Sequence, residues 1–100
     1  MLKLLDAVRQ LNNNNISSLN NIKKTLESRL DWLSFREPES SGMVYDSWSE
    51  KVDDLQEIID YIEELEDESD DEKIQDLIED IKDSVSSYQS IHGGLSRLKI

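Results

Sequence analysis

Apolar residues recur every three or four positions through most of the chain, and this spacing constrains the fold more than any other feature. Such a period places apolar side chains on one face of an α-helix, whereas a half-buried β-strand needs strict alternation. One hundred residues are enough for a single domain with a modest core. The sequence therefore predicts an all-α fold in which each helix buries one apolar face.

The first predicted helix covers residues 2–35. At 100° per residue its apolar side chains fall within an arc of roughly 140°. They are Leu4, Leu5, Val8, Leu11, Ile16, Leu19, Ile22, Leu26, Leu30 and Leu33. Part of this set repeats after eleven residues, which is close to three full turns of an α-helix. A straight helix therefore keeps the stripe on one side.

Four consecutive asparagines at residues 12–15 interrupt this stripe with low helix propensity. In one interpretation a helix of about 33 residues continues through them, and Asn12 and Asn15 form a polar layer that fixes the register. In the other, two helices meet at a kink. We expect the continuous helix, because the apolar phase is the same on both sides of the run.

Two more helices are predicted, at about residues 44–66 and about residues 70–92. The segment 36–42 contains Pro38, two serines and Gly42, and it is expected to form the first connection. The first of these helices starts either after Ser41 or at Ser47, where Ser47 and Glu50 form a capping box, and a second capping box at Ser69 favours the start of the other. The glycine pair after residue 92 should end the third helix, leaving residues 93–100 as a short tail of undetermined state. The apolar stripes comprise Val44, Trp48, Val52, Leu55, Ile59 and Ile62 in the second helix, and Ile74, Leu77, Ile78, Ile81, Val85 and Tyr88 in the third.

Short connections favour antiparallel neighbours, so residues 1–92 are expected to form a three-helix antiparallel domain with a long first helix. A first helix of that length spans roughly 50 Å, whereas the other two span roughly 30 Å each. The overhang would carry Leu4, Leu5, Val8 and Leu11, and an exposed leucine stripe usually packs on a second copy. We therefore expect a homodimer or a higher homo-oligomer. A break at the asparagines would weaken this expectation, because the first part could then fold back.

Acidic side chains are concentrated in the second half of the chain. Residues 46–83 contain 18 acids and only three lysines, and the formal net charge of the whole chain is −12. The first acid ridge comprises Asp46, Glu50, Asp53, Glu57, Asp60 and Glu64, and the second comprises Glu72, Asp76, Glu79 and Asp83. Like charges at this spacing cost a few tenths of a kcal/mol per pair, roughly, and alternating lysines would remove that cost. The pattern therefore either serves solubility alone or serves a partner.

Residues 46–83 carry a net charge of −15 over a hairpin roughly 30 Å long, which is about one net negative charge per 2 Å, and duplex DNA carries one per roughly 1.7 Å. Their field opposes direct binding to nucleic acid or to an anionic membrane, and it attracts basic protein surfaces. The first hypothesis is a small acidic interaction protein that inhibits a nucleic-acid-binding partner by occupying its basic surface, as a DNA mimic. Such an inhibitor would suit a phage or mobile element that counters a nuclease-based defence.

The alternative hypothesis is a structural or adaptor subunit. In that case the first helix drives oligomer assembly, and the acids only keep the assembly in solution. Reversing ridge charges would then leave the function intact, whereas polar substitutions in the leucine stripe would dissolve the assembly.

Trp32 and Phe35 lie off the apolar stripe of the first predicted helix, near its end. If the 36–45 loop folds over them, they are packing residues. If they stay exposed, they are secondary contacts for the partner, because Trp is enriched at binding hot spots.

Few residues suit catalysis. The chain has no cysteine, which excludes disulfides and cysteine nucleophiles, and its single histidine, His92, is expected to have a helix-terminal role. No glycine-rich phosphate loop or histidine–carboxylate metal pattern is present, so we expect no enzyme, cofactor or metal site. No segment approaches the roughly 20 apolar residues of a membrane span, and charges interrupt the N-terminal apolar stretch, so a cytoplasmic location is expected.

Overall fold

The computed structural model describes residues 2–39 and 42–100, so Ser40 and Ser41 of the predicted first connection lie outside it. The elements are α1 (Leu4–Arg9), α2 (Leu19–Ser34), α3 (Met43–Glu66), α4 (Asp71–Ile91) and a short 3₁₀ helix, η1 (Leu95–Arg97). Extended pairing within the described ranges is limited to two isolated bridges. The all-α prediction is confirmed, with four α-helices in place of the three expected.

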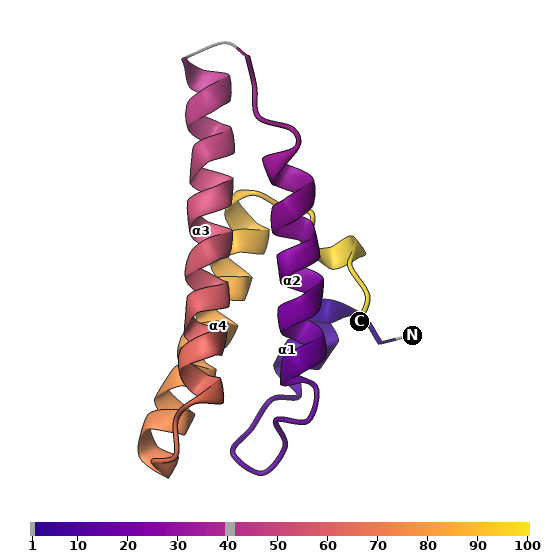
Figure 1. The fold of residues 1–100 in the computed structure, drawn as a ribbon. Helices are drawn as coiled ribbons and strands as arrows, with labels where there is room; N and C mark the ends of the chain where they lie inside the picture. The colour runs from indigo at the N-terminus through magenta and orange to yellow at the C-terminus, as the bar shows by residue number, and fades with distance from the viewer. Residues whose placement is uncertain (1, 40–41) are drawn as a thin grey trace.

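Consecutive long helices run in opposite directions (Figure 1). Both α2 and α4 pack against α3, while α1 and η1 pack against α4, and α1 also contacts α2. The resulting body measures 46 × 28 × 20 Å along its principal axes. No helix in the described part of the chain is both long enough and apolar enough to cross a membrane.

The asparagine run breaks the first predicted helix into α1 and α2. Asn12 and Asn15 exchange two backbone hydrogen bonds with N···O distances of 3.2 and 3.0 Å, and the Asn12 side chain accepts from the Asn14 amide at 2.8 Å. Asparagine stabilises turns in this way because its short side chain can bond to nearby backbone groups. The continuous helix over residues 2–35 is therefore wrong, and the polar layer of Asn12 and Asn15 does not form.

Because the chain turns at the asparagines, the N-terminal leucines pack inside the same molecule. Leu4, Val8 and Leu11 are buried, and Leu5 is partly buried against them. The structure has no overhanging leucine stripe. The argument for self-association from that stripe no longer applies.

The bounds of α3 and α4 lie close to those expected from apolar spacing, but the predicted caps differ. Asp70, not Ser69, caps α4, since its carboxylate accepts from the Glu72 and Lys73 amides at 3.0 and 3.4 Å. Ser47 lies inside α3, one turn after its start. The helix therefore starts before the predicted capping box at Ser47.

The C-terminal tail is part of the domain. Gly93 and Gly94 have φ angles of +70° and +90°, which lets the chain reverse at the end of α4. The tail then returns to the N-terminal segment, where the Ile100 amide donates to the Leu2 carbonyl at 3.0 Å. The two ends of the chain consequently lie side by side (Figure 1).

Candidate protein-interaction surfaces

The first acid ridge runs along the solvent side of α3, and every one of its carboxylates is exposed. The opposite face of α3 is buried and comprises Leu55, Ile58, Ile59, Ile62 and Leu65. Residues three or four apart share a helix face, so burial of the apolar stripe directs the ridge outward.

The second acid ridge has the same relation to α4. All of its members are exposed, and the buried face opposite comprises Leu77, Ile78, Ile81, Val85 and Tyr88. Glu57 of the first ridge and Asp83 of the second line one hollow of about 210 Å³ between α3 and α4. The two ridges therefore border the same groove between α3 and α4 at Glu57 and Asp83, and we call the surface that carries both ridges the hairpin face.

Within residues 2–39 and 42–100, no ridge carboxylate lies within 4.0 Å of a lysine or arginine nitrogen. The polar partners of the ridges are neutral donors. Gln56 Nε2 donates to Asp60 at 2.9 Å, and the Tyr61 hydroxyl donates to Glu57 at 3.1 Å. The bond to Glu57 raises the pKa of Tyr61 above its usual range. Neutral donors order these side chains without cancelling their charge.

Charge compensation on α3 is found instead where it meets α2. Lys23 Nζ lies 2.9 Å from Glu66 Oε1 and 4.0 Å from Glu63 Oε1, and the bond to Glu66 raises the pKa of Lys23. Neither glutamate belongs to a ridge. Acids on the α2 side of α3 are thus paired, while those on the hairpin face are not.

The hollow between the ridges also contains Asp54, whose Oδ2 lies 2.7 Å from His92 Nε2. The His92 ring is 5 % exposed and packs edge-on to Tyr88, and His92 is the C-cap residue of α4, at the helix end where it was expected. No group of His, Asp and Glu in the described ranges is arranged to hold a metal ion. The hollow is suited to a basic side chain of a partner.

Trp32 and Phe35 are exposed at the end of α2, away from the hairpin face. Phe35 is 90 % exposed and Trp32 is 41 % exposed, so the interpretation in which the 36–45 loop covers them is wrong. The guanidinium carbons of Arg29 and Arg36 lie 3.9 and 4.1 Å from the centre of the Trp32 ring. These arginines precede and follow Trp32 by about one helical turn.

The start of α3 adds further exposed apolar side chains that the sequence pattern did not reveal. Met43 is 89 % exposed, and Val44, expected in the core stripe, is 66 % exposed. Trp48 is half-buried, and its indole N–H donates to the Leu33 carbonyl at 2.8 Å near the end of α2. The aromatic end of the molecule comprises Trp32, Phe35, Met43, Val44, Tyr45 and Trp48.

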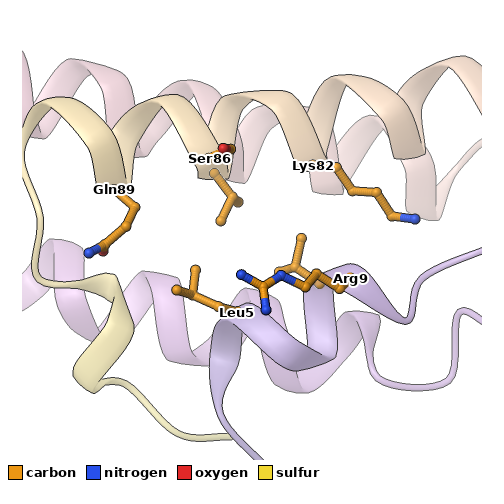
Figure 2. Close-up of a pocket in the computed structure, with 7 residues that line it drawn as sticks. Leu5, Arg9, Lys82, Ser86 and Gln89 are labelled. Carbon is orange, nitrogen blue, oxygen red and sulfur yellow. The ribbon is translucent and has the colours of Figure 1, made fainter.

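A separate hollow of about 160 Å³ lies between α1 and α4 (Figure 2). Leu5 contributes to its apolar wall, and Arg9 from α1 and Lys82 from α4 supply its charges. Arg9 also pairs with Asp6 at 3.5 Å. Sequence reasoning missed this hollow because it exists only when α1 folds back.

In comparisons with protein-family models, with curated proteins and with solved structures, no match to this chain is found. Function is therefore inferred from the chemistry of these surfaces alone.

Proposed function

We propose that this protein binds the basic, nucleic-acid-binding surface of a partner protein through its hairpin face, and that it inhibits the partner by occupying that surface. The observation that carries the proposal is that every ridge carboxylate is exposed and has no lysine or arginine partner within the described ranges. Because no internal cation neutralises it, such a surface attracts a basic partner with its full negative electrostatic potential.

The shape of the hairpin face supports mimicry of a nucleic acid. The ridges form two rows of carboxylates on adjacent packed helices, as the phosphates of a duplex form two rows along its strands. The first ridge spans about 27 Å, given 1.5 Å per residue. The six carboxylates of that ridge are about 5 Å apart on average, against about 3.4 Å between phosphates along one DNA strand, so a groove that accepts a duplex would meet rows of anions of somewhat lower density.

The hollow between the ridges supports a specific contact within this general attraction. Asp54, Glu57 and Asp83 line it, and they would receive one lysine or arginine side chain of the partner. Trp32 and Phe35, expected as secondary contacts of the same partner, lie on α2 and not on the hairpin face. Under this proposal the protein acts without enzymatic chemistry or a cofactor, in the cytoplasm.

The adaptor alternative depended on an exposed leucine stripe. Leu4, Val8 and Leu11 are buried instead, so no observation of the fold favours assembly through that stripe.

The test is capture of partners from a lysate, followed by affinity measurement against the captured nucleic-acid-binding protein at several NaCl concentrations. The ridge variant is E50K/D53K/E57K/D60K. The matched control, E27K/D31K/E37K/E39K, changes the net charge equally at exposed acids outside the ridges.

The ridge variant should lose at least about 100-fold in affinity, because favourable charge contacts become repulsive. The control should lose less than about threefold, and wild-type affinity should fall linearly on a log–log plot against salt. The protein should also displace nucleic acid from the partner. Equal losses in the two variants, or affinity independent of salt, would overturn the proposal.

A further inference from the structure

The two hollows beside Trp32, like the hollow between α1 and α4, have only cations among their charged lining residues, and they differ from it in lying beside exposed aromatic side chains. The larger, of about 450 Å³, lies between α2 and the start of α3 and is lined by Arg36 and Lys51 among apolar groups. The smaller, of about 340 Å³, is lined by Arg29 and Lys99. The chain has 23 acids and 11 bases, so two neighbouring hollows without a carboxylate depart from its overall charge.

These cations are also free of internal partners. In the part of the chain that the structure describes, no carboxylate lies within 4.0 Å of Arg29, Arg36, Lys51 or Lys99. The two arginines are held instead against the Trp32 ring, and a cation–π contact of this exposed kind contributes roughly 0.5–1 kcal/mol. A guanidinium held over a ring can still donate its N–H groups to a carboxylate.

Apolar side chains surround the same cations. Phe35, Met43 and Val44 are each more than half exposed and sit beside the larger hollow or at the adjoining helix end. Contiguous exposed apolar surface marks an interaction site, and Trp and Arg are the residue types enriched at binding hot spots.

We propose that the aromatic end, together with Arg29, Arg36, Lys51 and Lys99, binds an amphipathic peptide segment of a second partner, in which apolar anchor residues are flanked by carboxylates. The apolar anchor enters the hollow of about 450 Å³ between Trp32 and Trp48. The flanking carboxylates bind Arg36 and Lys51 on one side and Arg29 on the other. The hairpin face plays no part in this contact, so either proposal can fail without the other.

The charge and polarity of this surface favour an amphipathic acidic peptide over a second copy of the chain, a nucleic acid or an anionic membrane. A second copy of the chain that docked through the same surface would bring its own arginines and lysines against these cations, and like charges would repel. A nucleic acid or an anionic membrane would approach a molecule with a net charge of −12 and be repelled over its whole length. A short segment with a few carboxylates experiences little of that repulsion, and it supplies both features that the site requires.

The test is differential selection from a displayed library of random 16-residue peptides in 0.3 M NaCl. Peptides that bind both the wild-type protein and the ridge variant E50Q/D53N/E57Q/D60N are retained, which discards basic peptides that bind the ridges. Binding of the selected peptides is then followed by the fluorescence of Trp32 and Trp48, the only two tryptophans of the chain.

Selected peptides should combine aromatic or aliphatic residues with Asp or Glu. Their affinity should fall at least about tenfold in R36Q/K51Q and in W32A. It should change less than about twofold in R9Q/K82Q, which removes two cations from the hollow between α1 and α4, and in the ridge variant E50Q/D53N/E57Q/D60N. Circular dichroism would verify that each variant is folded.

Four results would overturn the proposal. They are a failure to enrich any peptide, enrichment of peptides without acids, equal affinity for R36Q/K51Q, and equal affinity for W32A. Sedimentation adds two more: a dimer lost in W32A would assign the surface to a second copy, and binding to phosphatidylglycerol vesicles lost in W32A would assign it to a membrane.

Discussion

The hairpin face and the aromatic end are two surfaces of one small molecule with opposite charge and opposite polarity. On the hairpin face the carboxylates are exposed and most apolar side chains are buried beneath them, with Ile91 exposed at one end of the hollow. At the aromatic end the cations surround apolar side chains that remain at the surface. The ridge carboxylates and the cations near Trp32 lie on different faces of the helices and do not pair with each other. Each surface therefore keeps its own electrostatic potential.

This separation depends on α3, which carries the first acid ridge on one face and the core on the other. Where α3 meets α2, compensation does occur, through Lys23 with Glu63 and Glu66. In the part of the chain that the structure describes, the ridges form no similar pair, although Lys51, Lys73 and Lys82 lie on the same two helices. The following predictions test whether the two regions behave differently in stability as well as in charge.

The largest expected effect concerns the core that both surfaces share. Leu4→Ala should destabilise the protein by about 3 kcal/mol in urea unfolding, because Leu4 is fully buried and the cavity is not refilled. Leu5→Ala, at a half-buried position one residue on, should cost less than about 1.5 kcal/mol. If light scattering showed that Leu4→Ala dissolves an oligomer without loss of stability, the leucines would be assembly residues after all.

A smaller effect is expected where the tail approaches the aromatic end. Gly94 has φ +90°, and a Cβ there would lie 2.9 Å from Arg29 Nη2. Gly94→Ala should therefore cost about 2 kcal/mol, from backbone strain and displacement of the arginine. Gly93→Ala is the matched control, since its φ is +70° but a Cβ meets no atom within 4 Å, so only the strain of about 1 kcal/mol applies. Equal losses at the two glycines would show that Arg29 is not held beside the tail.

The two regions should respond with opposite sign when their charges are removed. E50Q/D53N/E57Q/D60N should stabilise the protein by about 1 kcal/mol at low salt, because like-charged neighbours one turn apart repel. R29Q/R36Q should destabilise it by about 1 kcal/mol, because the contacts with Trp32 are lost. Both values come from urea unfolding in 20 mM buffer, and the same sign for both variants would remove the distinction between the surfaces.

Much of the fold could be predicted from apolar spacing alone. The stripes of α3 and α4 set their positions, and the opposite phase of the acids indicated that both ridges would face solvent. The asparagine run could not be decided, because the phase match across it is compatible with both a helix and a turn. The turn forms because side-chain and backbone hydrogen bonds at Asn12 and Asn15 stabilise it and because α1 can then bury its leucines.

The aromatic end could not be predicted for a different reason. Val44 belongs to the apolar stripe of α3 by spacing, yet α2 ends at Ser34 and the core at this end does not reach Val44, which is 66 % exposed. The cations near Trp32 come from α2, α3 and the tail, and no local pattern connects them. Only the packed fold brings Arg36, Lys51 and Lys99 to one region.

The central claim is that the carboxylates of the ridges repel one another and are not neutralised by cations of the same molecule. The dependence of the free energy of unfolding on salt measures this repulsion most directly. The free energy of unfolding should rise by about 1 kcal/mol between 0.02 and 0.3 M NaCl, as the screening length shortens to less than the spacing of distant ridge charges. In E50Q/D53N/E57Q/D60N most of that rise should disappear. A free energy that is constant or falls with salt would mean that attractive ion pairs outweigh the repulsion, and would contradict the account.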